Sequence, residues 1–242
     1  MQFEREYRIG IRELGKSNKL SNLGLLEFLE EIASLHSATV GFGINDISET
    51  KKSWILMDWK VKIIDRPLYN NVLNIKTWSR GTTRKRGVYT YRDFEVYHNA
   101  ELVAIASSKW VLLDIEKGNI TRLTDDIMDL YQSEERYVFE EPEIEKLEEF
   151  EGYEEKTSYT VKRFDIDINN HVHNINYLNI AYEALPENIY NMEELNNIRI
   201  MYKHEITYGD TVSCLYKFED GKHKINIKSE DGEVLHAIVE LY

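Results

Sequence analysis

The amino-acid sequence predicts an α+β protein in which one arrangement, a helix lying on an antiparallel sheet, occurs twice along the chain. Two observations lead to this fold class. An amphipathic helical pattern is followed by several strand-like segments, and the same order of segments returns after residue 153. An amphipathic helix must bury its apolar stripe, and a sheet supplies the partner. Because 42% of the 242 residues are hydrophobic, the chain can form sizeable cores and is not disordered throughout.

The first half is predicted to contain one long helix and four strands. Residues 20–40 carry apolar side chains at helical spacing, and Gly41 and Gly43 end the pattern. The stripe consists of Leu25, Leu26, Leu29, Ile32, Ala33 and His36. The strands are predicted at 53–64, 72–79, 86–97 and 101–113. Small side chains in the middle of the last strand would let the helix lie close to the sheet.

The second half repeats this order. A strand is predicted at 157–163, a helix at 174–185, and further strands at 198–206, 210–219, 222–229 and 233–241. Asp-Gly pairs at 220 and 231 are typical of tight hairpins between such strands. A shift of 152 residues places Tyr7 on Tyr159 and Leu26 on Leu178. This faint similarity predicts an internal repeat of one helix-on-sheet unit.

An acidic stretch separates the two halves. Residues 134–155 contain eleven Glu against two basic residues, a net charge of −9 out of the −13 of the whole chain. We therefore predict a first domain at 1–133, an acidic linker at 134–152 and a second domain at 153–242. Ile144 and Leu147 stand three apart among charges, which predicts a short exposed helix in the linker. The alternative is a regulatory acidic segment.

Composition excludes several classes of protein. A net charge of −13 argues against general nucleic-acid binding. Cys214 is the only cysteine, so no intramolecular disulfide and no Cys-based zinc cluster can form, and its alternating strand pattern favours a core position. The charged start and the lack of an apolar run of about 18 to 20 residues predict no signal peptide and no membrane span. We expect a soluble cytoplasmic protein; the oligomeric state stays open, with a homodimer among the alternatives.

The densest group of polar side chains lies between a predicted strand and the second helix. Asp167, Asn169 and His171 are two residues apart, so an extended segment would point them to one side. A carboxylate can activate water or attack a carbonyl, and Asn and His can donate hydrogen bonds to the carbonyl oxygen. Asn174 is the expected N-cap of the helix, whose first amides would face developing negative charge. These parts suit cleavage of an activated acyl bond; the alternative is a polar turn rich in Asx residues.

The segment from Asp167 to Tyr177, followed by Glu183 and Pro186, resembles the acyl-ACP thioesterases, enzymes that hydrolyse fatty acyl chains off acyl carrier protein. The family pattern is close to D-x-N-x-H-V-N-N-x-x-Y. Further matches lie at Thr77-Trp78, Arg92-Asp93-Phe94-Glu95-Val96 and Ser108-Lys109-Trp110-Val111-Leu112. The resemblance covers nearly the whole chain. It implies two tandem hotdog domains, no cofactor, and release of free fatty acid that terminates elongation.

The resemblance also implies a fourth polar residue, a Glu 38 positions beyond the motif Asp, which is Glu205 here. Many family members have Cys next to that Glu, but this chain has Ile206, so no thiol can act there. His173 stands where the family usually has Asn. Metal binding by His171, His173 and His204 is a weak alternative, because no standard zinc spacing is present and the family needs no metal.

The first domain is implied to hold the acyl chain, because Gly15 and Lys19 stand where the second domain has Asp167 and His171. The predicted lining consists of Leu25, Leu29, Ile32, Trp54, Leu56 and Met57, each of which could equally be ordinary core. Acyl carrier protein is acidic, so docking needs a local positive patch. Its predicted members are Arg80, Arg84, Lys85 and Arg86, with Lys109 beside them. The alternative for this cluster is a solvated turn between strands.

Three other functions compete with this interpretation. A thioesterase acting on CoA esters would use the same site. A hotdog dehydratase would use the His and the acid to move protons on the acyl chain. A non-catalytic acyl-binding module would bind the ligand without turnover, which the complete set of Asp, Asn and His argues against.

Overall fold

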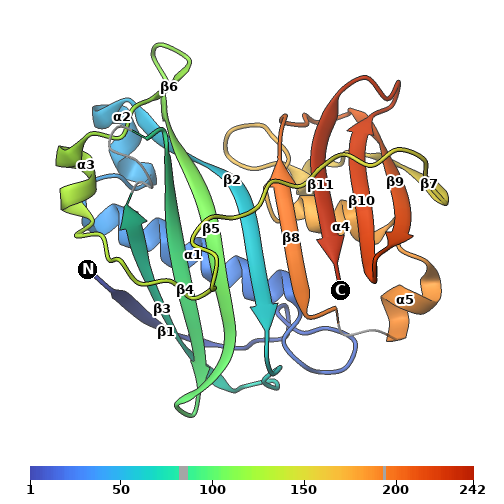
Figure 1. The fold of residues 1–242 in the computed structure, drawn as a ribbon, viewed down its shortest axis with the longest axis horizontal. Coiled ribbons are helices and arrows are strands. Elements are labelled where there is room, and N and C mark those ends of the chain that lie inside the picture. Colours follow the sequence, from blue (N-terminus) through green and yellow to red (C-terminus); the bar gives the residue numbers. More distant parts are fainter. Residues whose placement is uncertain (82–86, 193–194) are drawn as a thin grey trace. The chain divides into compact units, whose positions relative to one another are not determined.

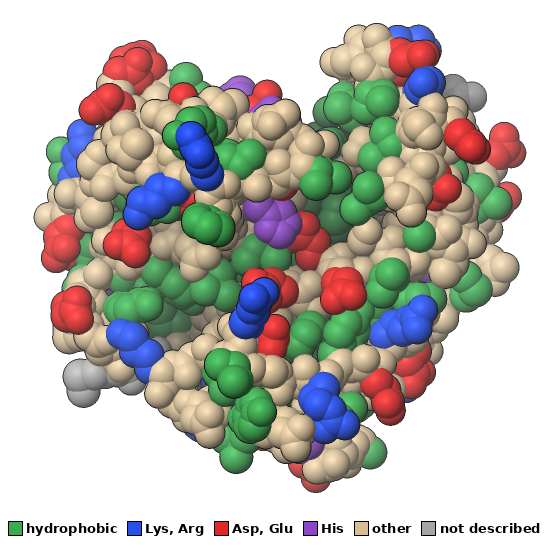
Figure 2. Space-filling view, turned by 180° about the vertical axis from the view of Figure 1, so that it is seen from behind, with side chains coloured by type: hydrophobic (Ala, Val, Ile, Leu, Met, Phe, Trp, Pro, Cys, Tyr) green, Lys and Arg blue, Asp and Glu red, His purple; other side chains and the backbone are tan. Residues whose placement is uncertain are grey.

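A computed structural model describes residues 1–81, 87–192 and 195–242. They form two compact units, Met1–Met57 with Val61–Ile144 and Asp58–Lys60 with Glu145–Tyr242. Each unit has an antiparallel sheet and a helix of its own (Figure 1), as the α+β prediction requires. In the described residues, no helix has both the length and the apolar character needed to cross a membrane. Acidic, basic and hydrophobic side chains are interspersed on the face shown in Figure 2, so the net negative charge does not make that face uniformly acidic.

The sheet of the first unit confirms the predicted strands. Its order is β1 (Phe3–Arg8), β3 (Val72–Gly81), β4 (Tyr89–His98), β5 (Glu101–Asp114) and β2 (Lys52–Ile63), with β6 (Asn119–Thr121) pairing to β5. The long helix α1 (Asn22–Thr39) begins where Ser21 Oγ accepts a hydrogen bond from Gly24 N at 3.0 Å. Its predicted stripe is buried, since Leu25, Leu29 and Ile32 have no exposed surface.

The second unit repeats this arrangement with a shorter helix. Its strand order is β8 (Asn197–Tyr202), β11 (Leu235–Leu241), β10 (Lys222–Ser229), β9 (Thr211–Glu219) and β7 (Glu155–Thr160). The helix α4 (Asn176–Tyr182) ends three residues before the predicted 185. Between β9 and β10, Asp220 and Gly221 have φ of +54° and +74°, the left-handed pair that a tight hairpin needs.

Short helices of one or two turns were not predicted. They are α2 (Ile47–Thr50), α3 (Asp125–Leu130), α5 (Glu187–Met192) and two 3-10 turns at Ile44–Asp46 and Arg163–Asp165. Segments of three to six residues are too short to display a helical period, so a hydrophobic pattern cannot reveal them.

Cys214 lies in the core of the second unit, as predicted. It has no exposed surface, and its thiol donates to Ile180 O at 3.7 Å. Burial raises the pKa of this thiol to about 12. A thiol with so high a pKa is not ionised near neutral pH and cannot act as a nucleophile there.

The predicted exposed helix in the acidic stretch is wrong. The segment has no helix, and Ile144 and Leu147 are only 7% and 6% exposed. Leu147 packs with Met201 and Ile238 of the second unit. For Leu147, burial against strands that are distant in the sequence outweighs the local spacing, because it removes the side chain from water without forming a helix.

The internal repeat is confirmed by matching backbone hydrogen bonds. Before each helix the chain forms the same five-residue turn, which we call the Gly15 turn (residues 15–19) and the Asp167 turn (residues 167–171). Gly15 N donates to the carbonyl of residue 19 at 2.8 Å, and Asp167 N donates to that of residue 171 at 2.8 Å. The fourth residue of each turn, Asn18 or Asn170, is left-handed with φ of +59° or +64°. All of these pairs are 152 residues apart, the predicted shift.

Candidate active site

The Asp167 turn brings Asp167, Asn169 and His171 together, but not in the predicted way. The segment is folded back rather than extended, since Asn170 N donates to Asp167 O at 3.2 Å. Asp167 Oδ1 accepts from Asn169 N at 2.8 Å and from His171 N at 3.2 Å, and its Oδ2 accepts from Asn169 Nδ2 at 3.2 Å. The carboxylate is therefore the centre of the group. The inference from strand alternation was wrong, because the left-handed Asn170 reverses the chain.

The segment that carries Glu205 runs beside this turn. Val172 N donates to Ile206 O at 2.8 Å, and His171 forms an antiparallel bridge with Thr207. Glu205 itself is exposed, whereas Ile206 is fully buried. These backbone contacts hold the segment that carries Glu205 beside the Asp167 turn.

Tyr177 on α4 is a further residue of this site, and sequence reasoning did not assign it a role. Its hydroxyl donates to His204 O at 3.2 Å. Burial raises the pKa of this hydroxyl, and the negative charges of Glu205 and Asp167 raise it further. Both carboxylates thus act electrostatically on one phenol. The sequence signal that could have identified this residue is that Tyr177 is the last residue of the motif that begins at Asp167.

A second tyrosine fixes the start of the helix. Tyr202 on β8 packs edge-on against Tyr177, with ring centroids 5.3 Å apart. Its hydroxyl donates to Asn174 O at 2.9 Å. Together the two phenols tie α4 to the sheet beside the Asp167 turn.

The predicted N-cap role of Asn174 is wrong. The N-cap of α4 is Ile175, and no side chain caps it. Asn176 N donates to His173 O at 2.8 Å, because a turn precedes the helix. Tyr177 N likewise donates to Asn174 O at 3.3 Å. These amides are used within the protein, so side-chain donors are the better candidates for an oxyanion.

The Gly15 turn provides an internal comparison for the carboxylate. Gly15 has no side chain, yet Asn18 N donates to Gly15 O at 3.1 Å, as Asn170 N does to Asp167 O at 3.2 Å. The same turn therefore forms from backbone hydrogen bonds alone. Its shape does not explain why Asp stands at 167, which weighs against the alternative of a merely structural Asx turn.

The predicted acyl-chain residues lie in the first unit. Leu25, Leu29 and Ile32 of α1 are fully buried, and Leu56 is 2% exposed. Trp54 and Met57 are half-buried. Trp54 Nε1 donates to the hydroxyl of Tyr131 at 2.8 Å. Residues at these positions could belong to an ordinary hydrophobic core or line a pocket for the acyl chain. Their role in binding the acyl chain therefore stays a prediction.

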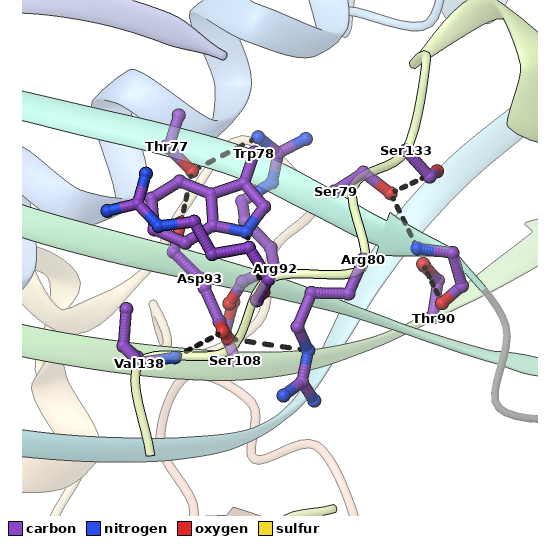
Figure 3. A network of polar contacts seen from close by, with 12 residues as sticks. Thr77, Trp78, Ser79, Arg80, Thr90, Arg92, Asp93, Ser108, Ser133 and Val138 are labelled. Atoms are coloured by element: carbon purple, nitrogen blue, oxygen red, sulfur yellow. Dashed lines mark hydrogen bonds and ion pairs between the residues drawn. The ribbon is translucent and has the colours of Figure 1, made fainter. Parts of the chain in front are cut away.

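The predicted docking role of Arg80 is not compatible with its position. Its side chain is only 4% exposed, and Nε lies 3.5 Å from Asp93 Oδ1 (Figure 3). Its guanidinium also lies over the ring of Tyr91, 4.5 Å from the centroid. A charge neutralised inside the unit cannot attract a partner at the surface. Arg84, Lys85 and Arg86 lie outside the described residues.

Residues of the family-like motifs surround this buried ion pair. Val138 N donates to Asp93 Oδ2 at 3.1 Å (Figure 3). Trp78 Nε1 donates to Arg136 O at 3.0 Å. Burial raises the pKa of Asp93 and lowers the pKa of Arg80, each against the effect of the partner's charge. The motif residues thus fasten the segment after α3 to strands β3 and β4.

A second buried cation lies on β4. Arg92 donates to His36 Nδ1 at 2.6 Å and to Thr77 Oγ1 at 3.3 Å. Burial, followed by the positive charge of Arg92, lowers the pKa of His36 to about 3. His36, which was predicted as part of the helix stripe, is therefore neutral and accepts a hydrogen bond from the guanidinium.

This pair predicts a pH dependence of stability. The unfolded chain binds a proton on His36 below about pH 6.5, and the folded chain does so only near pH 3. The contribution of neutral His36 to the free energy of unfolding is fully present above pH 6.5. It is lost as the pH falls, by about 1.4 kcal/mol per pH unit. We expect the free energy of unfolding, measured with urea between pH 4.5 and 7.5, to change less steeply with pH in the variant His36→Gln than in wild type. The Gln side chain keeps an acceptor for Arg92. Equal slopes would contradict a neutral His36.

The fold and the site define a tandem hotdog protein. Its cluster of Asp167, Asn169 and His171 lies in the second unit. Models of the acyl-ACP thioesterase N-terminal and C-terminal domains match residues 1–131 and 148–240. The chain belongs to the acyl-ACP thioesterase family.

Relatives with curated functions and solved structures agree with this family. The oleoyl-acyl carrier protein thioesterase 2 of Arabidopsis thaliana is 28% identical over 87% of this chain and 60% of its own length. The chain spans about 60% of the length of such relatives. An acyl-ACP thioesterase of Bacteroides thetaiotaomicron has a TM-score of 0.85 at 21% identity, covering 99% of this chain and 96% of its own. The 12:0-ACP thioesterase of Umbellularia californica has a TM-score of 0.86 at 18% identity, with the same coverage.

Proposed function

We propose that this protein hydrolyses the thioester of acyl-[acyl carrier protein] and releases a free fatty acid, which terminates elongation of that chain. The observation that carries the proposal is the difference between the two turns. They share one backbone, but only the second has Asp, Asn and His at its first, third and fifth positions, where the first has Gly15, Ser17 and Lys19. Membership of the family and the printed functions of the relatives support the same reaction.

In the proposed mechanism a water molecule attacks the thioester carbonyl. Asp167 or Glu205 positions the water and takes its proton, while the Asn169 amide and the His171 ring donate to the developing oxyanion. A C–O bond forms, the tetrahedral intermediate collapses, and the C–S bond breaks. The thiolate of the carrier's phosphopantetheine arm leaves and takes up a proton. Direct attack by a carboxylate through an anhydride is the alternative, and single turnover in labelled water distinguishes the two routes.

The remaining parts of the proposal concern the first unit and the partners. The buried face of α1 and strand β2 would hold the acyl chain. Arg84, Lys85 and Arg86 stay predicted contacts to the acidic carrier, and assembly as a homodimer stays a prediction.

The proposal is tested with acyl carrier protein thioesters of increasing chain length, each beside the matching CoA ester. We expect release of free fatty acid, a larger kcat/KM for the carrier protein esters, and full activity after exhaustive chelation. A larger kcat/KM for CoA esters would favour the rival thioesterase. Acyl binding by folded protein without any release would favour the non-catalytic module and overturn the proposal.

A further inference from the structure

Three turns of the second unit lie side by side around the candidate catalytic residues. They comprise residues 162–165, the Asp167 turn and residues 207–210. Val161 N donates to Asp210 O at 2.9 Å, which joins the first turn to the third. The bridge between His171 and Thr207 joins the second turn to the third. Loops held together in this way form one continuous surface beside the site.

Each of the three turns is shaped by an aspartate. Asp165 Oδ2 accepts from Lys162 N at 2.7 Å, and Asp210 Oδ2 accepts from Thr207 N at 2.8 Å. Asp167 holds the middle turn through the amides of Asn169 and His171. Because these bonds fix the backbone, the residues between them are held in place rather than left to collapse onto the unit.

Each turn presents a large apolar side chain to solvent. Phe164 is 100% exposed, Ile168 is 76% exposed and Tyr208 is 57% exposed. We call these three residues the apolar rim. Single exposed apolar residues are common, but a group on adjoining turns beside a polar site is typical of an interaction surface.

The first unit shows that the turns do not require these apolar residues. Its equivalent bonds have the same lengths: Gly10 N donates to Glu13 Oε2 at 2.7 Å, and Leu68 N donates to Asn71 Oδ1 at 2.8 Å. At the positions of Phe164 and Ile168, however, it has the exposed charged residues Arg12 and Lys16. The residue of the first unit that corresponds to Tyr208 is Tyr69, which is also exposed, at 51%. Apolar side chains at 164 and 168 are therefore specific to the unit that carries Asp167, whereas an exposed aromatic side chain at the position of Tyr208 occurs in both units.

Exposed basic residues flank the rim. Lys162, Arg163 and Lys203 are all exposed, and the guanidinium of Arg163 lies 5.8 Å from the centroid of the Tyr208 ring. Asp165 and Asp210 on these turns and the exposed Glu205 are acidic, so the basic edge is confined to Lys162 and Arg163 beside Phe164. An apolar surface edged by cations is complementary to a protein that is acidic and presents apolar side chains.

We propose that the apolar rim is the surface on which the acyl carrier protein docks, an inference that rests on the proposed function. The carrier is acidic, and the thioester must enter the site on the carrier's own phosphopantetheine arm. The carrier body must therefore rest within the length of that arm, which the rim satisfies because Ile168 belongs to the same turn as Asp167. The rim would bind the carrier and leave the chemical step to the polar residues.

The test compares two substrates that share the thioester and differ in the carrier. Wild type, Phe164→Ser and Tyr208→Ser are assayed with an acyl carrier protein ester and with the matching acyl-N-acetylcysteamine, and their Kd for holo acyl carrier protein is measured. We expect each variant to raise KM for the carrier ester and Kd for the carrier about tenfold, while kcat/KM for the small thioester stays within twofold. The matched controls Tyr69→Ser and Ile11→Ser, at exposed positions of 51% and 78% in the first unit, should behave as wild type.

The outcomes separate this inference from the proposed function. Equal losses on both substrates, or carrier Kd values unchanged in both rim variants, would overturn the docking surface while hydrolysis by wild type upheld the reaction. If wild type hydrolysed neither substrate, the proposed function would fail, and the carrier Kd would still decide on the rim. A rim variant that altered only self-association would assign the rim to a second copy of the chain and overturn the inference.

Discussion

Replacing Asp167 by Asn is expected to lower kcat for thioester hydrolysis by about 100-fold or more while the protein stays folded. The Asn side chain keeps an oxygen that can accept from Asn169 N and His171 N, so the turn retains these two backbone bonds and loses only the bond from Asn169 Nδ2 to Oδ2. The Gly15 turn shows that the backbone holds this shape even without a side chain there. What is lost is the negative charge that, with Asp167 as the proposed base, takes a proton from water, and a general base contributes about 100- to 10,000-fold.

The measurement is free fatty acid release under saturating substrate, beside thermal unfolding of each variant. Asp210→Asn is the matched control, because Asp210 closes a neighbouring turn in the same way and has no proposed chemical role. We expect that control to retain activity within about threefold. His171→Ala should fall to a similar level as Asp167→Asn, since both would act on one carbonyl. An Asp167→Asn protein with more than a tenth of the wild-type rate would exclude Asp167 as the essential base.

Removing the carboxylate of Asp93 is expected to destabilise the first unit by about 3 to 5 kcal/mol, the usual cost of leaving a buried charge without its partner. The side chains of Arg80 and Asp93 are 4% and 0% exposed, and the opposed pKa directions show that burial penalises both charges. In Asp93→Ala the Arg80 guanidinium loses its counter-ion and Val138 N loses its acceptor. Urea unfolding of wild type and variant at pH 7 measures the difference.

An exposed ion pair in the same chain supplies the control. Lys146 Nζ and Glu148 Oε1 are 3.0 Å apart, with side chains 65% and 77% exposed. Glu148→Ala should change the free energy of unfolding by no more than about 1 kcal/mol. The double variant Arg80→Met with Asp93→Leu should recover about half of the loss or more, because it buries no charge. An Asp93→Ala protein as stable as Glu148→Ala would contradict the structural role of the pair.

The parts of the fold with a clear local period could be predicted from the sequence. The stripe of α1 and the alternation of the long strands depend on neighbours within one element, so α1 and β2 to β5 agree with prediction. Leu147 misled the prediction because its burial depends on strands about 50 to 90 residues away. The short helices carried no period at all.

The candidate site was predictable in composition but not in geometry. The spacing of Asp, Asn and His was enough to identify the polar group. The left-handed conformation of Asn170, which reverses the chain within the Asp167 turn, left only a weak signal in the sequence. The burial of Arg80 could not be foreseen, because it follows from the register that sets Trp78 opposite Asp93. The exposure of Phe164 was equally hidden, since a lone Phe between charged residues gives no period to interpret.

The matching Gly15 and Asp167 turns have a consequence for the history and stoichiometry of the protein. Two copies of one backbone device within a polypeptide are what an ancestral duplication leaves behind, and here the copies have diverged in chemistry while keeping their hydrogen bonds. If the proposed function holds, each polypeptide has one site for thioester hydrolysis, and the first unit keeps the same turn without the reacting side chains.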